Sequence, residues 1–384
     1  MTTLSRPRRC GAGCWTVRPS PRPAGWRAGE FLAGRQPLFD ARISGGHVLD
    51  GHGDLLADDI YCLDDGPRIL DCLEFDDRLR WLDGLDDAAF LAMDLERLGA
   101  TGLARRFADW YAEYSGDPAP ASLRHHYVAY RAFVRAKVAC IQARQGDAGA
   151  AGQAGQLAEI TLRHLRAGAV TLVLIGGLPG TGKSALAGAV ADRLGFCVLS
   201  SDQVRKELAG APPQRGAAVP YGTGIYTAAW TERCYAELRR RAAGLLASGE
   251  SVIIDASWTS AAQRAADAAL TGEASARLVQ LCCTASPELA SQRMAARPDG
   301  ASDADAEIVR HMAAAMAAWP AATVIATERG GSGGAQASAG AFGDLVQCAP
   351  SRRSARMGPA TSGAPPGRCY CQTEQRLSLV SSSS

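Results

Sequence analysis

Lysine is scarce in this chain of 384 residues, with only Lys137, Lys183 and Lys206 against 38 arginines. The net charge of +2 is close to neutral, so no overall field favours nucleic acid or a membrane surface. No apolar run reaches the length of a membrane-spanning helix, and the N-terminus has no signal-peptide core. We therefore expect a cytoplasmic protein with no membrane partner, for which a nucleic-acid partner is possible but not favoured.

The 12 cysteines form no zinc-binding pattern. Two close pairs occur, at 10/14 and 369/371, but neither has a second pair or histidines at zinc spacing. Three others lie in apolar runs and are expected to be small buried hydrophobic residues: Cys197, Cys282 and Cys283. Such scattered cysteines indicate a reducing, cytoplasmic setting.

Composition divides the chain into five segments. Residues 1–38 are rich in Arg, Pro and Gly without periodicity and are predicted to be disordered, as is the Gly/Ser/Pro-rich tail 328–384. Segments 39–145 and 169–327 have the patterning of globular units, and 146–168 starts as a Gly/Ala/Gln linker leading into a helix.

The segment 169–327 alternates apolar β-branched runs with helical patterns. The predicted strands are 170–176, 196–200, 251–255, 277–283 and 322–326. The predicted helices are 183–194, 202–209, 227–248, 260–271, 286–296 and 303–317. This alternation predicts an α/β fold, a parallel sheet with helices on both faces that binds ligands beyond the carboxyl ends of its strands.

The loop after the first of these strands has the most informative sequence, G-L-P-G-T-G-K-S at 177–184. It fits G-x-x-x-x-G-K-[ST], a phosphate-binding loop (P-loop), and lies between a strand and a helix start as that loop requires. The glycines allow backbone amides to point inward as an anion nest, and the helix start adds further N–H groups. The residues expected to bind ATP are Gly177, Leu178, Pro179, Gly180, Thr181, Gly182, Lys183, Ser184 and Ala185.

Within this loop, Lys183 is expected to contact the β- and γ-phosphates, and the hydroxyl of Ser184 to hold Mg²⁺. The alternative is a glycine-rich turn that binds nothing. A chance match is less favoured because lysine is so rare in this chain. A second Mg²⁺-orienting group is predicted at Asp255, which ends the β run V-I-I-D as in a Walker-B strand. A plain acid at a strand end is the alternative.

Two further groups of residues could take part in chemistry. Asp202, after the second strand, could accept a proton from an attacking hydroxyl, with Arg205 binding an anionic part of the substrate. A helix N-cap is the simpler explanation of Asp202. Arg293 and Arg297 share a helical face and could close over the phosphates as a lid, or form a solvated basic face. Trp258, Thr259 and Arg264 could line the substrate side, or simply begin an amphipathic helix.

Together these residues resemble a group of small P-loop kinases related to polynucleotide kinase, gluconate kinase, zeta toxin and chloramphenicol phosphotransferase. The resemblance is carried by the loop 177–184, the S-S-D-x-x-R of 200–205, Asp255 and the two lid-like arginines. It implies that Asp202 serves as the general base for a substrate hydroxyl.

The first globular segment carries H-G-D-L at 52–55, followed by an apolar run that ends in Asp71. This resembles the catalytic and metal-binding segments of aminoglycoside phosphotransferase-like kinases, and the helical patterns at 85–98 and 127–137 fit the C-terminal lobe of that fold. The resemblance implies that Asp54 corresponds to the proton acceptor and Asp71 to the metal ligand. The chain as a whole resembles bifunctional proteins in which such a domain precedes a P-loop kinase-like domain.

The match departs from this pattern in two places. Asp59 stands where a metal-binding Asn is expected, and no lysine precedes Phe39 to serve a phosphate-binding N-terminal lobe. We therefore predict a mainly helical, partial kinase-like domain whose site is vestigial, or a helical domain retained for packing or partner contact.

The leading hypothesis is an ATP- and Mg²⁺-dependent kinase that phosphorylates a hydroxyl of an unknown small molecule or of a nucleic-acid end. The catalytic residues would be Lys183, Asp202, Arg293 and Arg297. One rival is a regulatory module that binds or slowly hydrolyses ATP without an acceptor, and another is an inactive scaffold.

Overall fold

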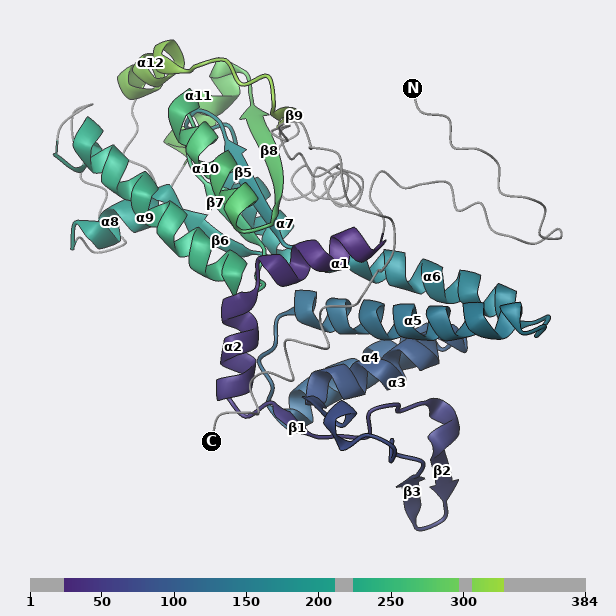
Figure 1. Cartoon of the computed structure of the whole chain (residues 1–384). Helices are drawn as coiled ribbons and strands as arrows, with labels where there is room; N and C mark the ends of the chain where they lie inside the picture. Colours follow the sequence, from purple (N-terminus) through teal and green to yellow (C-terminus); the bar gives the residue numbers. More distant parts are fainter. Residues whose placement is uncertain (1–23, 211–223, 297–305, 328–384) are drawn as a thin grey trace, which may run out of the picture.

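The computed structural model describes residues 24–210, 224–296 and 306–327. These residues form a helical region and an α/β region, joined by two N-terminal helices that lie between them (Figure 1). No helix in the described ranges is long and apolar enough to cross a membrane.

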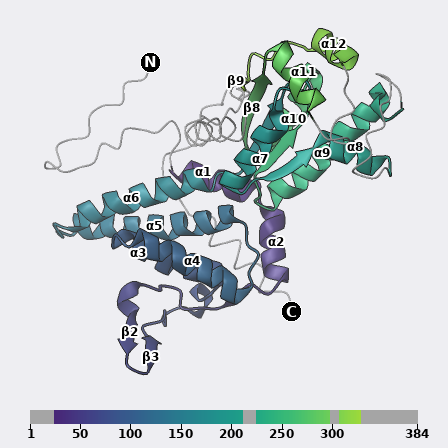
Figure 2. The ribbon, with the colours of Figure 1, turned by 180° about the vertical axis from the view of Figure 1, so that it is seen from behind.

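The helical region is built from four helices: α3 (Gly84–Arg97), α4 (Thr101–Ser115), α5 (Ala121–Arg144) and α6 (Ala150–Ala167). Phe90 and Met93 of α3 are buried against small side chains of α5 such as Ala132. Alanines on both α5 and α6 let the two helix backbones lie close together along most of their length, as seen from either side in Figures 1 and 2.

The segment 146–168 does not behave as a linker. Helix α6 begins at Ala150, and its residues Ala154, Leu157 and Ile160 are buried in the core of the helical region. The Gly/Ala/Gln composition that suggested a linker instead reflects a helix that packs closely, because small side chains allow a short interaxial distance.

The predicted disorder of 1–38 is also wrong for its last fifteen residues. Helix α1 spans Ala24–Ala33 and α2 spans Gln36–Ser44, while 1–23 lie outside the described residues. Phe31 and Leu38 are each 7% exposed and join the core. Tertiary burial of these two side chains stabilises helices of only 10 and 9 residues, which are too short to be stable in isolation.

Short strands follow α2. Strand β1 (Val48–Asp50) pairs with β4 (Trp81–Asp83), and β2 (Ile60–Leu63) forms an antiparallel hairpin with β3 (Gly66–Ile69). Two 3₁₀ turns, η1 (Ala57–Asp59) and η2 (Asp77–Leu79), connect them.

The α/β region confirms the predicted parallel sheet. Its strands are β5 (Thr171–Gly176), β6 (Cys197–Ser200), β7 (Val252–Asp255), β8 (Arg277–Thr284) and β9 (Thr323–Ala326). They lie in the order β6-β7-β5-β8-β9, and every pairing is parallel. The most deeply placed strand, β5, is therefore the one that leads into the predicted P-loop.

Helices cover both faces of this sheet. They are α7 (Lys183–Leu194), α8 (Ser201–Leu208), α9 (Ala228–Ala247), α10 (Ala261–Glu273), α11 (Pro287–Ala295) and α12 (Ala306–Ala315), with a 3₁₀ turn η3 (Gly224–Tyr226) before α9. Val173 and Ile175 pack with α7, whereas Leu172 and Leu174 pack with α9, because successive side chains of a strand point to opposite faces.

The two regions share one hydrophobic core. Leu85 of α3 and Leu123 of α5 belong to the same buried cluster as Val170 and Leu172 at the start of β5. Phe31 and Leu38 complete this cluster from α1 and α2. The segment boundary predicted near residue 169 is therefore a change in architecture and not a break in packing.

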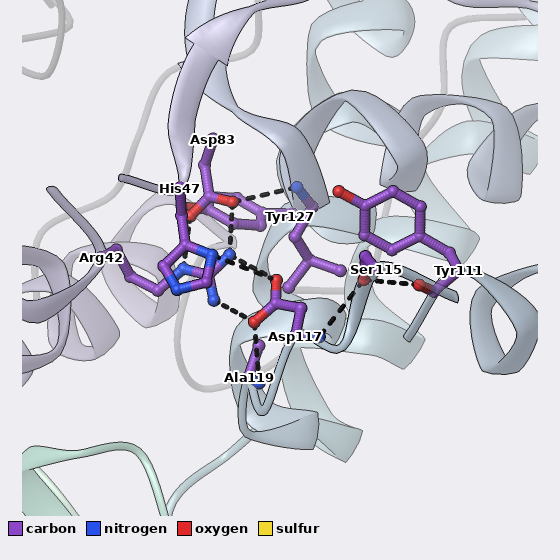
Figure 3. A network of polar contacts seen from close by, with 9 residues as sticks. Arg42, His47, Asp83, Tyr111, Ser115, Asp117, Ala119 and Tyr127 are labelled. Carbon is purple, nitrogen blue, oxygen red and sulfur yellow. Dashed lines mark hydrogen bonds and ion pairs between the residues drawn. The ribbon is translucent and has the colours of Figure 1, made fainter. Parts of the chain in front are cut away.

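A buried ion-pair network fastens α2 to the helical region (Figure 3). Arg42 donates to both carboxylate oxygens of Asp83 over 2.6 and 2.8 Å, and to Asp117 over 2.7 Å. Asp83 also accepts from the hydroxyl of Tyr127 and caps α3 through Leu85 N–H. Burial alone lowers the pKa of Arg42, but hydrogen bonds and attraction from both carboxylates outweigh burial and raise it.

This network predicts that Arg42→Met strongly destabilises the fold. The substitution leaves two carboxylates buried without their cation, a change that costs about 3–5 kcal/mol. Urea unfolding followed by circular dichroism measures the loss. Arg78→Met is the control, because the side chain of Arg78 is 83% exposed and its removal should leave the stability of the fold nearly unchanged. Equal stability of both variants would contradict this account of the junction.

Candidate functional site

The P-loop lies at the carboxyl edge of the sheet, between the end of β5 at Gly176 and the start of α7 at Lys183. Gly182 is the residue before the helix and has a left-handed backbone with φ of +84°. Because α7 begins here, its first N–H groups have no intrahelical acceptors, and the positive end of the helix dipole lies at the loop.

Two other glycines are required by close approach as well as by backbone angle. Gly177 has φ of +142°, and a Cβ there would lie 2.5 Å from the carbonyl oxygen of Cys283. Gly180 has φ of +80°, and a Cβ there would lie 2.9 Å from Ala290 C and still closer to its carbonyl oxygen. The loop is thus seated against the end of β8 and the backbone of α11.

The loop side chains divide into supporting and accessible groups. Thr181 is 4% exposed and donates to the carbonyl of Leu178 over 2.7 Å, so it holds the loop's shape. Pro179 is buried and Leu178 is half-buried. The side chain of Lys183 is half-buried, whereas Ser184 and Ala185 are exposed. The two groups predicted to meet phosphate and metal are therefore reachable from solvent.

Register places the predicted acidic residue beside this loop. Asp255 pairs with Ile175 of β5 on one side and with Ser200 of β6 on the other, and it is 5% exposed. Cys283, at the end of the neighbouring β8, has its pKa raised to about 12 by burial, and both Lys183 and Asp255 influence it electrostatically. Asp255 at the end of β7 and Lys183 at the start of α7 therefore both lie at the carboxyl ends of the central strands.

Ser184 and Asp255 fit Mg²⁺ only as part of a site that they share with substrate phosphates. The described residues hold no cluster of three or more His, Cys, Asp or Glu that could bind a metal. The hydroxyl of Ser184 and the carboxylate of Asp255 are hard oxygen donors, and Mg²⁺ is commonly held by one or two such groups plus substrate phosphates. The arrangement therefore suits a metal that arrives with a nucleotide.

Asp202 lies at the same edge but is not the N-cap of its helix. Helix α8 starts at Ser201 with Ser200 at the cap position, so Asp202 lies in the first helical turn, two residues beyond the partner of Asp255. Asp202 is half-buried, so part of the residue is exposed to solvent.

Arg205, predicted to bind substrate, is only 7% exposed and contacts other residues of the protein. Its Nη1 donates to the carbonyl of Ile225 over 2.7 Å, and its guanidinium stacks on the ring of Tyr226. Its contacts in the described residues therefore order the segment before α9, and the substrate role stays a prediction.

Arg293 is held beside the P-loop through a residue that sequence reasoning missed. Its Nη1 and Nη2 donate to the hydroxyl and carbonyl of Thr327 over 3.0 and 2.6 Å, and the Thr327 hydroxyl donates to the carbonyl of Thr181 over 2.8 Å. The guanidinium also approaches Gly182. No motif includes Thr327; only its place just after the last predicted strand could have indicated it. Arg297 lies outside the described residues.

The residues after β7 support the sheet. Trp258 is fully buried and has a left-handed backbone with φ of +54°. Arg264 is 5% exposed, donates to the carbonyls of Trp258 and Ala318, and stacks on Trp319. Thr259 is half-buried. Trp258 and Arg264 therefore form an inner layer beneath the loop and do not line an open substrate surface.

In the helical region, the segments around Asp54 and Asp71 run side by side. His52 donates from Nε2 to the carbonyl of Leu70 over 2.8 Å and accepts from Leu73 N–H over 3.0 Å. Asp54 is half-buried, and burial raises its pKa although Arg135 nearby opposes this. Asp71 is exposed with φ of +66°. The hairpin β2–β3 connects the two acids.

Comparison with known proteins supports the reading of the α/β region. Residues 172–319 match the family model of an AAA domain, which extends from β5 to the approach to β9. Two curated relatives, uncharacterized proteins of Mycobacterium tuberculosis (strain H37Rv) and Mycobacterium bovis, are each 46% identical over 290 residues. The match covers 76% of this chain and 58% of each relative, so the chain spans less than two thirds of their length.

Similar solved structures each cover less than half of this chain. A sugar kinase from Janibacter sp. is 22% identical with a TM-score of 0.34, covering 46% of this chain and 95% of its own. The APS kinase of Mycobacterium tuberculosis is 18% identical with a TM-score of 0.33, covering 47% and 98%. A gluconokinase from Sinorhizobium meliloti is 17% identical with a TM-score of 0.31, covering 46% and 95%. The assignment of this region as a P-loop α/β fold rests on its sheet, its loop and the AAA-domain match.

The glycine geometry yields a paired prediction. Gly180→Ala places a methyl group against the backbone of Ala290 at a positive φ, which should cost about 1–3 kcal/mol and distort the loop. Gly188→Ala, in α7 with open space around it, should instead stabilise by up to about 1 kcal/mol. Thermal unfolding with and without ATP·Mg²⁺ compares them. A Gly180→Ala variant as stable as the Gly188→Ala variant would show that the loop is not tightly seated.

Proposed function

We propose that the α/β region is an ATP-dependent phosphotransferase that transfers the γ-phosphoryl group of ATP·Mg²⁺ to a hydroxyl of a small molecule. The observation that supports this most directly is the P-loop at the carboxyl edge of the sheet, with Lys183, Asp255 and Arg293 gathered beside it. Parallel α/β sheets bind their ligands at this edge.

The roles follow from the positions of these groups. Backbone N–H groups of the loop and of the first turn of α7 bind the polyphosphate, and the ammonium of Lys183 balances charge on its terminal oxygens. Arg293, fixed by Thr327, adds a second cation next to Gly182. These fixed charges favour the transition state because they need no reorganisation as the phosphoryl group moves.

Asp202 is the proposed proton acceptor. As the substrate oxygen forms its bond to the γ-phosphorus, the bond from that phosphorus to the β–γ bridging oxygen breaks, and the hydroxyl proton moves to the carboxylate of Asp202. ADP leaves with the bridging oxygen. The metal, held by Ser184 and Asp255 together with phosphate oxygens, would neutralise charge on the transferring group.

For the helical region, we propose a kinase-like remnant in which Asp54 and Asp71 are vestigial counterparts of a proton acceptor and a metal ligand. The close approach of their two segments through His52 supports this proposal. The acceptor molecule is unknown, and a nucleic-acid end is less favoured than a small molecule because the chain's net charge is only +2.

A regulatory ATP-binding module is the second candidate. It is favoured by the hydrophobic core that the helical and α/β regions share, because nucleotide binding at one end of β5 could alter packing at the other. This candidate has no need for a proton acceptor at Asp202.

Nucleotide binding is tested with Lys183→Ala. Loss of a charge-assisted contact worth about 1.5–3 kcal/mol should weaken ATP·Mg²⁺ binding roughly 10- to 100-fold, measured by isothermal titration calorimetry. Lys137→Ala is the matched control, because Lys137 lies in the helical region over the ring of Phe133. Equal and negligible binding by wild type and the Lys183→Ala variant would rule out both nucleotide-based functions.

Phosphoryl transfer is tested with Asp202→Asn. Without a proton acceptor, acceptor-dependent ADP production from a panel of sugars and alcohols should fall by about 10²- to 10⁴-fold, while ATP affinity stays unchanged. Asp192→Asn, at an exposed position of α7, is the control. ATP turnover that is independent of any acceptor and persists in the Asp202→Asn variant would instead support the regulatory module.

A further inference from the structure

A cavity of about 50 Å³ lies where α1, α5 and α6 meet the start of the sheet. It is far from the P-loop in the fold, because it borders Val170 just before β5, whereas the P-loop follows the other end of that strand. Its polar lining is mainly basic: Arg27, Arg35, Arg277, His126 and His164, with Glu30 as the acidic member.

Arg35 is the unusual member of this lining. Arg35 is only 1% exposed. Its Nη1 donates to the carbonyls of Gly34 and Ala274, each over 2.7 Å. Its guanidinium also lies 5.6 Å from the ring centre of Phe31. No carboxylate among the described residues pairs with it, and its Nε–H is buried without an acceptor there.

A buried cation without a counter-ion is costly, so such a group calls for a negative partner. Burial lowers the pKa of Arg35 to about 10, which expresses this cost. Carbonyl oxygens satisfy one nitrogen but bring no net charge. The Nε–H has no acceptor among the described residues, and the edge of a guanidinium matches the oxygens of an oxyanion.

His126 provides a second unsatisfied group in the same cavity. The residue is 8% exposed, its ring stacks on Phe31 at 4.4 Å, and its Nδ1 is buried without a hydrogen-bond partner in the described part of the chain. By contrast, His164 is engaged at both nitrogens, with His125 over 2.9 Å and Glu96 over 3.0 Å. His126 can therefore donate to a bound group, while His164 is fixed as part of the wall.

We propose that this cavity is a binding site for a small oxyanion, a phosphate or a similar tetrahedral anion, with the guanidinium of Arg35 as its central cation and His126 as a second donor. Arg277 at the first residue of β8 contributes to the positive potential from the sheet side. The cavity size suits one such anion or a few water molecules. This site is separate from the P-loop and does not depend on the proposed kinase activity.

The test is titration of sodium phosphate into the full chain at constant ionic strength, followed by calorimetry and by thermal unfolding. The experiment uses a Lys183→Ala background, since phosphate could also bind at the P-loop. Saturable phosphate binding is expected to persist in that background and to weaken at least tenfold when Arg35→Met is added. Because methionine removes a buried uncompensated charge, Arg35→Met is not expected to lower the melting temperature measured without phosphate.

A second variant and a control keep the result decisive. Arg277→Gln is the second variant, for use if Arg35→Met does not fold, and it should also weaken phosphate binding. Arg78→Met changes an exposed side chain and should leave phosphate binding unchanged. Sulfate should compete with phosphate, and sodium chloride should not reproduce the shift. The proposal is overturned if phosphate binds the Arg35→Met and parent proteins equally, or if its effect matches that of chloride, which would indicate an adventitious ion only. Absence of saturable binding would also overturn it.

Discussion

The complete burial of β5 is the constraint on which the rest of the structure depends. All six residues from Thr171 to Gly176 are buried, so both faces of the strand must be covered and both edges must be hydrogen-bonded. Strands β7 and β8 hydrogen-bond to the two edges of β5, and helices α7 and α9 pack on its two faces. The helical region packs against its N-terminal end near Val170. With the strand held on every side, the loop that follows Gly176 has little freedom, and its amide groups are preorganised for an anion before any ligand arrives.

Much of this arrangement could be predicted from sequence because the signal is local. Runs such as V-I-I-D at 252–255 are strongly β-forming. The ends of every predicted strand of the sheet agree with those of an observed strand to within about two residues. The glycines of the P-loop are informative for the same reason, since a positive φ at Gly180 and Gly182 leaves few alternatives. The convergence of Lys183 and Asp255 then follows from parallel strand order alone.

The parts that could not be predicted depend on partners distant in sequence. Helix α1 forms because Phe31 finds a place in a core built mostly from residues beyond position 120, and its own composition gives no hint of that core. Thr327 gains its role only when β9 brings it next to Arg293 and Thr181. Arg35 likewise lies in a segment predicted to be disordered, and its burial depends on a carbonyl at position 274, 239 residues away.

Two buried arginines at the junction of the regions show how differently such groups can be accommodated. Arg42 is surrounded by Asp83 and Asp117, so its charge is compensated within the fold and it fastens α2 to the helical region. Arg35, at the bend between α1 and α2, contacts the loop before β8 with only carbonyl oxygens to balance it. The contact between the α1–α2 bend and the loop before β8 is therefore weaker electrostatically than the contact between α2 and the helical region. An anion bound at Arg35 would strengthen that contact by supplying the negative charge that the carbonyl oxygens lack, and it would do so at the end of β5 opposite the P-loop.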